Sequence, residues 1–145
     1  MLHIEDLLQS WQLLAQGLGN TVFIALLAGV LSLTTGTILG ILYHRQTPIL
    51  SQLTYVYVQL IRSLPLILFL VFVHYGLLPI IILQPNFLFS AIIAFSLFES
   101  AYIAEIIRAG MASIKTEERD AAKSLGLNKT QRITLIYLPL ATRRT

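Results

Sequence analysis

The chain has 145 residues, of which 56% are hydrophobic and 12% charged, and its mean hydropathy is +0.76. Soluble domains carry about 25% charged residues, so this composition excludes an ordinary soluble domain and indicates a membrane protein. The length allows three or four helical spans of about 20 residues each, and therefore one membrane domain. The sequence contains no cysteine, which excludes disulfides, thiolate metal sites and cysteine nucleophiles.

The first predicted span covers residues 20–43 and follows an N-terminal segment, 1–18. It has no charged residue and is long enough to cross a ~30 Å hydrocarbon core as a helix. Gly36 and Gly40 form a Gly-x-x-x-Gly pattern, which permits close approach of a neighbouring helix. Small residues are also common in membrane helices without any such contact, so both interpretations stay open. Further small residues share these spacings of three and four: Ala25, Ala28, Gly29 and Ser32.

Residues 51–83 are apolar over too long a stretch for one straight span, since a helix of that length would extend roughly 50 Å. Ser63 is a candidate N-cap with Pro65 in the first turn, which predicts a second span over 64–83. Arg62 would then lie at the membrane edge. Pro79 and Pro85 predict an irregular connection after this span.

The third predicted span covers residues 87–109 and contains Glu99 near its middle. A carboxylate at that depth costs about 2.5–3.5 kcal/mol, so Glu99 is expected to face the bundle interior, find a partner or be protonated. It either lines a translocation path or makes a hydrogen bond that holds helices together. Glu105 and Arg108, one turn apart, predict a structural ion pair at the far end of this span, where the Arg108 side chain can reach the membrane edge.

The distribution of basic residues predicts the orientation of the chain. All ten Lys and Arg residues are Arg45, Arg62 or residues from Arg108 onward. By the positive-inside rule, the Arg45 loop and the segment after Arg108 are cytoplasmic, while the N-terminus lies outside. The net charge of +3 follows from this topology, and nothing else in the sequence indicates nucleic-acid binding.

The polar segment 110–145 is predicted to form a loop with two short helices. Residues 117–125 favour a helix that Thr116 caps and that Gly126 ends in a left-handed conformation. Asn128 starts a second stretch over 129–138, which Pro139 stops or kinks. The first helix carries a small apolar patch that fits either a groove on a partner protein or the bilayer surface. This patch consists of Ala121, Ala122, Leu125 and Leu127.

Three motifs occur in order along the second half of the chain: AYIAEIIRAG over 101–110, DAAKSLG over 120–126 and IYLP over 136–139. Together they resemble the polar amino acid uptake family of ATP-binding-cassette (ABC) importer permeases, in which AYxAExxRxG precedes an EAAxxLG loop. The resemblance implies an all-α integral membrane protein with a type I ABC importer transmembrane domain over 19–145. In that family the loop docks on the ATP-binding subunit. The matching docking positions are Asp120, Ala121, Ala122 and Gly126.

This resemblance also implies the partners and the location. They are an ATP-binding subunit that holds ATP and magnesium, a second permease subunit, a solute-binding protein, an amino acid substrate and membrane lipid. The chain itself would need no cofactor, would not be an enzyme, and would lie in the cell inner membrane as a multi-pass protein. His3, His44 and His74 are too scattered to predict a metal site.

The sequence departs from the family pattern in two respects. Asp120 stands where the motif usually has Glu, and Glu117–Glu118 replaces the usual Gly-Gln. Family members continue for two further spans after the Leu-Pro, so these spans are missing here and the sequence is expected to be a fragment or an incomplete product. The alternative function is a truncated permease or a small membrane scaffold, which binds the ATP-binding subunit or a neighbouring subunit without transporting.

Overall fold

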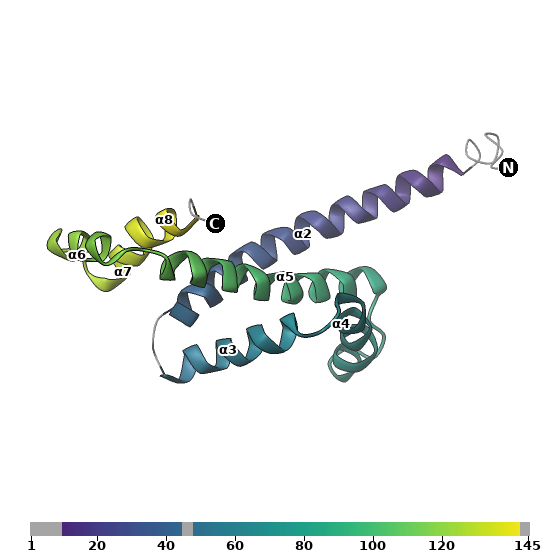
Figure 1. Cartoon of the computed structure of the whole chain (residues 1–145). Coiled ribbons are helices and arrows are strands. Elements are labelled where there is room, and N and C mark those ends of the chain that lie inside the picture. Colours follow the sequence, from purple (N-terminus) through teal and green to yellow (C-terminus); the bar gives the residue numbers. More distant parts are fainter. Residues whose placement is uncertain (1–9, 45–47, 143–145) are drawn as a thin grey trace.

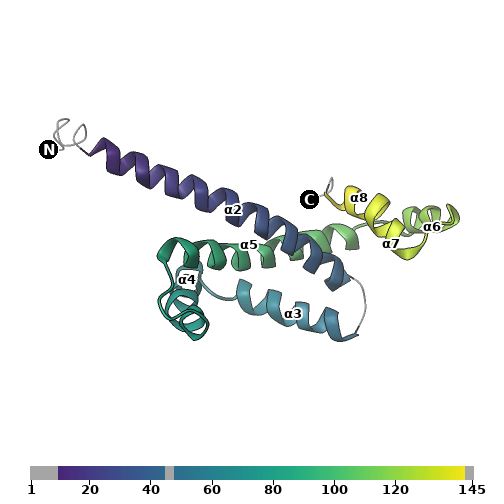
Figure 2. The same ribbon diagram turned by 180° about the vertical axis from the view of Figure 1, so that it is seen from behind.

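The computed structural model describes residues 10–44 and 48–142, and every regular element within them is helical. The helix α2 (Trp11–His44) crosses α5 (Phe87–Ala112), and α3 (Pro48–Arg62) packs against both helices (Figures 1 and 2). The short helix α4 (Leu66–Phe72) lies near the start of α5, whereas the C-terminal helices gather at its other end. The predicted all-α membrane fold is confirmed.

The C-terminal group consists of four short elements in chain order. They are α6 (Thr116–Ser124), α7 (Lys129–Gln131), the π-helical η3 (Arg132–Tyr137) and α8 (Leu138–Thr142). The helix runs on from α7 through η3 to α8, so Pro139 does not stop it. A π-helical stretch shifts the hydrogen-bond register by one residue, and such stretches interrupt helices without ending them.

Among the described residues, two helices are long and apolar enough to cross a membrane, Trp11–His44 and Phe87–Ala112. The first begins nine residues before the predicted start at 20, because the stretch from Trp11 to Asn20 contains no proline, and the helix continues through Gly17 and Gly19 with its polar side chains exposed. The second extends three residues past the predicted end at 109, and Asn86 caps its start, as its side-chain oxygen accepts from the Leu88 N–H at 2.9 Å.

The apolar stretch 51–83 is broken at the predicted place. The helical pair Ile49–Arg62 and Leu66–Ile80 bends by 109° across Ser63–Pro65. Ser63 does not cap α4, since its hydroxyl donates back to the Leu60 carbonyl at 2.8 Å. After α4 the chain continues as π-helix (η1, Val73–Leu77) and 3-10 helix (η2, Leu78–Ile80), so the helical segment is shorter than the predicted span 64–83. The segment Leu66–Ile80 has fifteen helical residues, which extend about 22 Å and are too short to cross a ~30 Å hydrocarbon core. The bent pair therefore counts as one candidate span only when its two halves are taken together.

The helices α2 and α5 approach each other at Gly36 and Gly40, which decides between the two interpretations of this glycine pattern in favour of a close helix contact. A Cβ atom added to Gly36 would lie 2.7 Å from the Ile103 Cβ and 2.9 Å from the Ser100 carbonyl oxygen. One added to Gly40 would lie 2.7 Å from the Ile107 Cβ. Side chains larger than hydrogen therefore cannot occupy these positions unless the helices move apart. By contrast, Gly29 has no atom within 4 Å of the added Cβ and takes no part in the contact.

A second contact region joins α3 and α4 to α5. The buried side chains Val58, Ile61 and Phe69 pack with Phe98. Tyr57 donates its hydroxyl to the Leu97 carbonyl at 2.6 Å and lies 2.8 Å from the Ser100 hydroxyl. Because the phenol of Tyr57 in α3 bonds a backbone carbonyl of α5, it ties the bent pair to the middle of α5.

Much of the remaining surface is apolar. Large side chains along α2 such as Leu26, Val30 and Ile38 are more than half exposed. A water-soluble monomer rarely exposes apolar surface on this scale, whereas lipid or neighbouring subunits would cover it in a membrane.

Replacing Gly36 by alanine should destabilise the fold by about 1–3 kcal/mol, because the new methyl group collides with Ile103 and with the Ser100 backbone. Gly29→Ala is the matched control on the same helix and should leave stability unchanged or slightly raised. Unfolding by sodium dodecyl sulfate in mixed micelles measures both variants. Equal stability of Gly36→Ala and Gly29→Ala would contradict the close approach.

Candidate functional site

The polar loop after α5 is built from two short helices joined by a tight turn. The helix α6 begins after Lys115, whose backbone N–H donates a hydrogen bond to the Glu118 carboxylate at 3.1 Å. Thr116, the predicted cap, is the first helical residue instead. Gly126 has a φ of +70° and donates its N–H to the Lys123 carbonyl at 3.1 Å, which confirms the predicted left-handed end. Asn128 then caps α7 by accepting from the Gln131 N–H at 2.8 Å.

The four predicted docking residues do not all face the same way. Asp120, Ala121 and Gly126 are exposed, whereas Ala122 is only 2% exposed. Asp120 accepts from the Lys123 ammonium at 2.7 Å. A methyl-sized side chain at position 122 lets α6 lie close against its own chain, so Asp120, Ala121 and Gly126 are the predicted docking residues that another molecule could contact.

An arginine that the sequence analysis did not single out attaches α6 to the span before it. The Arg119 guanidinium donates to the Met111 carbonyl at 2.9 Å and to the Ile114 carbonyl at 3.2 Å. Its other face lies over the Tyr137 ring, 5.9 Å from the centroid. These hydrogen bonds are made to one carbonyl in the last turn of α5, Met111, and to one just after that helix, Ile114. The charge pattern of the loop gave no signal for such a role, since an arginine among acidic residues indicates a solvated helix face equally well.

The three residues predicted at the membrane edge meet in one cluster. Glu105 accepts from both Nε and Nη2 of Arg108, with the Nε contact at 3.0 Å. The Arg62 Nη1 atom lies 3.9 Å from the same carboxylate, which joins α3 to α5. Each guanidinium also covers an aromatic ring, Arg62 that of Tyr102 at 5.4 Å and Arg108 that of Tyr43 at 5.0 Å. The cluster therefore links α2, α3 and α5, and only its i, i+3 pair was predicted.

Glu99 lies in an open groove between α2 and α5, with a volume of about 430 Å³. The side chain is exposed within this chain, and no hydrogen bond or ion pair joins it to another described residue. Small residues of α2 that do not take part in the glycine contact line the opposite wall: Ala25, Ala28, Gly29 and Ser32. Of the three outcomes expected for Glu99, a partner for its carboxylate is not found within residues 10–44 and 48–142.

The described part of the chain contains no group of three His, Asp or Glu side chains placed to hold a metal ion. His74, one of the histidines considered above, is buried with its Nδ1 atom 2.7 Å from the Ser90 hydroxyl and its ring stacked on Phe87. These contacts give His74 a packing role at the start of α5.

A family model described as a binding-protein-dependent transport system inner membrane component matches residues 32–144. The chain belongs to this family. Its matched region begins within α2 and includes α5, the membrane-edge cluster and the whole loop, so the importer-permease resemblance drawn from the loop motifs is confirmed.

Curated relatives carry the names of amino acid permeases. The chain is 41% identical over 124 residues to a probable glutamine ABC transporter permease protein, GlnP, of Bacillus subtilis (strain 168), covering 86% of this chain and 56% of that protein. It is 35% identical over 147 residues to the glutamate/aspartate import permease protein GltK of Escherichia coli O157:H7, covering 96% of this chain and 65% of that protein. The chain thus spans less than two thirds of the length of these relatives.

A solved structure supports the fold independently. The crystal structure of an amino acid ABC transporter with histidines matches with a TM-score of 0.83 at 23% identity, over 98% of this chain and 66% of that chain. At this identity the match establishes the arrangement of helices.

The membrane-edge cluster generates a quantitative prediction. Because Arg108 meets Glu105 with two hydrogen bonds and Arg62 meets it with one long contact, a double-mutant cycle should give about 0.5–1 kcal/mol for Glu105–Arg108 and less than about 0.5 kcal/mol for Glu105–Arg62. Both values are small because all three side chains remain partly exposed. Unfolding of the alanine variants in mixed micelles supplies the energies. A larger coupling to Arg62 would mean that the interhelical pair dominates.

Proposed function

We propose that this chain forms part of the transmembrane permease subunit of an ATP-driven amino acid importer. The observation that carries the proposal is the exposed α6 surface, which presents the importer loop motif at the end of a membrane helix in a chain of the importer family. The relatives named for glutamine and for glutamate/aspartate transport support an amino acid as substrate.

In this proposal α6 docks on a separate ATP-binding subunit through Asp120, Ala121 and Gly126, with Ala122 setting the close packing behind them. That subunit holds ATP and magnesium and carries out hydrolysis, so this chain has no catalytic residue. A second permease subunit, a solute-binding protein and lipid complete the assembly. The apolar outer face of α2 supports a lipid or subunit neighbour.

The orientation proposed has the N-terminus outside and α6 in the cytoplasm of a cell whose inner membrane the chain crosses more than once. The positive-inside rule supports it, since all basic residues other than Arg45 and Arg62 lie from Arg108 onward. This orientation places α6 on the side where ATP is available.

Movement of α6 would reach the membrane through Arg119. Because this side chain bonds the Met111 and Ile114 carbonyls, a displacement of α6 pulls on the end of α5 directly. The helix α5 is in turn held to α2 at the two glycines and carries Glu99 in the groove between them. Alternating access then follows from tilting of this unit, with Glu99 lining the translocation path and Arg62, Glu105 and Arg108 holding the helices together at its edge.

Uptake of a labelled amino acid tests the proposal in cells that lack their own permease and express the protein with its ATP-binding subunit. Gly126→Pro should reduce uptake at least about tenfold, because proline cannot adopt a φ of +70° and lacks the N–H that Lys123 accepts. Gly126→Asn is the matched control and should retain uptake, since asparagine tolerates the left-handed conformation.

The same assay measures Glu99→Gln, which should lower uptake while the ATP-binding subunit still co-purifies. Normal uptake by Gly126→Pro would contradict docking through this turn. Co-purification of the ATP-binding subunit without any uptake by the unmodified protein would instead support the non-transporting scaffold.

A further inference from the structure

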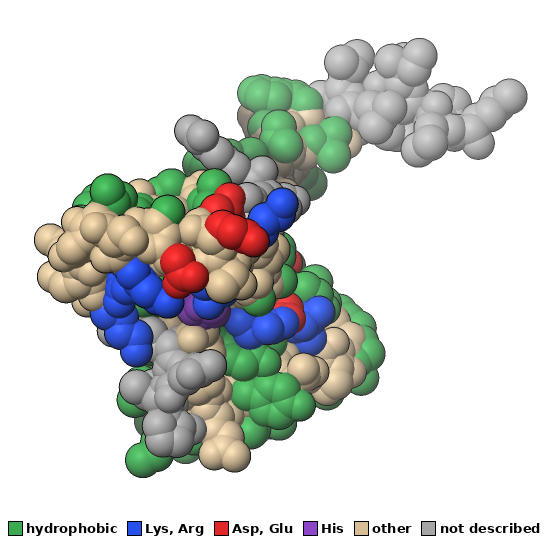
Figure 3. Space-filling model, turned by 60° about the vertical axis from the view of Figure 1, so that its left-hand side comes forward, with side chains coloured by type: hydrophobic (Ala, Val, Ile, Leu, Met, Phe, Trp, Pro, Cys, Tyr) green, Lys and Arg blue, Asp and Glu red, His purple; other side chains and the backbone are tan. Residues whose placement is uncertain are grey.

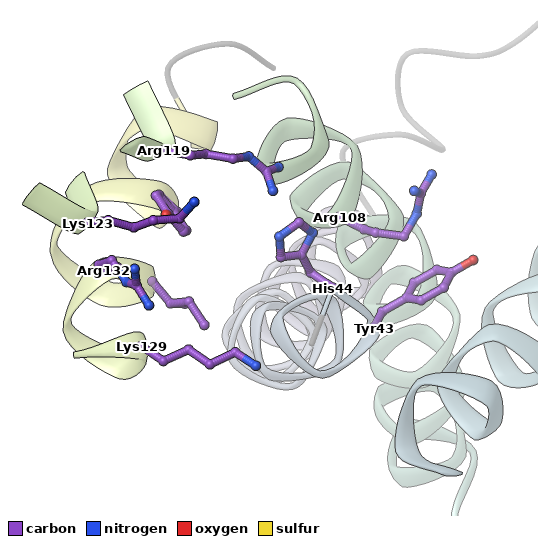
Figure 4. Close-up of a pocket in the computed structure, with 9 residues that line it drawn as sticks. Tyr43, His44, Arg108, Arg119, Lys123, Lys129 and Arg132 are labelled. Carbon is purple, nitrogen blue, oxygen red and sulfur yellow. The ribbon is translucent and has the colours of Figure 1, made fainter. Parts of the chain in front are cut away.

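A basic pocket lies between the C-terminal ends of α2 and α5 and the loop helices, with a volume of about 450 Å³ (Figure 4). Pockets that bind small molecules typically measure about 300–1,000 Å³. Arg119, Lys123, Lys129 and Arg132 enter from the loop helices and face His44 of α2 across the hollow, while Arg108 and Tyr43 lie at its other side. On the surface, blue basic side chains gather around this end of the molecule (Figure 3).

The positive charge of the basic pocket is only partly balanced. Arg108 is paired with Glu105, and Lys123 with Asp120. Within residues 10–44 and 48–142, no carboxylate lies within ion-pair distance of Arg119, Lys129 or Arg132. The Arg119 guanidinium donates its two hydrogen bonds to uncharged backbone carbonyls, so its positive charge is not compensated by them. Three like charges around one hollow repel each other unless an anion joins them.

Arg132 supplies a second, independent observation. Its Nε atom is buried and has no hydrogen-bond partner among the described residues. A buried donor on a charged group is costly to leave unpaired, and native proteins almost always pair such groups with protein, water or a ligand. The unsatisfied N–H and the unbalanced charge occur on the same side chain of the same pocket.

The position of the pocket selects the kind of anion. It lies where two apolar membrane helices end, at His44 of α2 and just past Arg108 of α5, which is the level of the lipid headgroups. The planar guanidinium of Arg132 and the flexible ammonium of Lys129 suit the tetrahedral oxygens of a phosphate. Aromatic and apolar side chains, Tyr43, Ile133 and Tyr137, line the rest of the hollow and suit the organic part of a phosphate ester.

We propose that the basic pocket binds a phosphate group, carried either by an anionic lipid headgroup or by a soluble phosphate compound. Arg132 and Lys129 hold the phosphate oxygens, and Arg119 adds charge from the α6 side. Because Arg119 also fastens α6 to α5, an occupied pocket joins the loop to both membrane helices. None of the pocket residues is one of the proposed docking residues, although Lys123 of the pocket pairs with Asp120. The binding test uses this protein alone and does not depend on docking.

Binding of three probes to the purified protein in neutral detergent tests the proposal: dioctanoyl phosphatidylglycerol, dioctanoyl phosphatidylcholine and inorganic phosphate. Phosphatidylglycerol or inorganic phosphate should bind saturably. Arg132→Gln should raise the dissociation constant at least about tenfold, since it removes the charged fork. The control Lys115→Gln removes one charge from an exposed side chain outside the pocket and should leave it within about twofold.

Each outcome decides the question. Saturable binding of phosphatidylglycerol, but not of phosphatidylcholine, identifies a lipid headgroup as the source, whereas saturable binding of inorganic phosphate identifies a soluble one. If Arg132→Gln fails to fold, Lys129→Gln replaces it, because the Lys129 side chain is exposed and its loss costs no packing. The proposal is overturned if neither anion binds saturably, or if the pocket variant and Lys115→Gln weaken binding equally, as diffuse surface charge would produce.

Discussion

The close approach of α2 and α5 at Gly36 and Gly40 is the contact on which the rest of the structure depends. The two longest helices have few other features that could fix their separation, because much of the surface of α2 is apolar and faces outward. In lipid there is little hydrophobic drive for helices to associate, so backbone proximity and van der Waals contact must supply it. With hydrogen at both positions, Ile103 and Ile107 of α5 pack directly on the α2 backbone.

Three features follow from that contact. Beyond the glycines, towards the N-terminus of α2, the helices leave the groove that contains Glu99. At the opposite end, their termini come together, which brings Tyr43 over Arg108 and creates the membrane-edge cluster. The same termini provide two walls of the basic pocket, while Arg119 holds the loop helices against them. A change in the angle between α2 and α5 would therefore affect the groove, the cluster and the loop together.

The sequence predicted those features that local chemistry determines. Hydropathy located the two long helices, and Ser63–Pro65 marked the bend, because proline lacks a backbone N–H and disfavours a helical conformation in the residue before it. The left-handed Gly126 and the cap at Asn128 also followed from residue type. Long-range partners could not be predicted: no pattern indicates that Gly36 meets Ile103, that Arg62 reaches Glu105, or that Arg119 bonds the end of α5. The inward side of Ala122 was missed for the same reason, since a small residue serves equally well on a buried face and on a docking face.

A cross-linking experiment in native membranes tests most directly whether the exposed face of α6 meets an ATP-binding subunit, as proposed above. The sequence contains no cysteine, so a photoactivatable maleimide reagent labels this chain only at a cysteine introduced by substitution. Ala121→Cys should cross-link to the ATP-binding subunit, whereas Leu83→Cys, which is equally open at 96% exposure but lies in the connection before α5, should not. Cross-linking from Ala121→Cys to lipid alone would contradict the account and would mean that α6 lies on the bilayer surface.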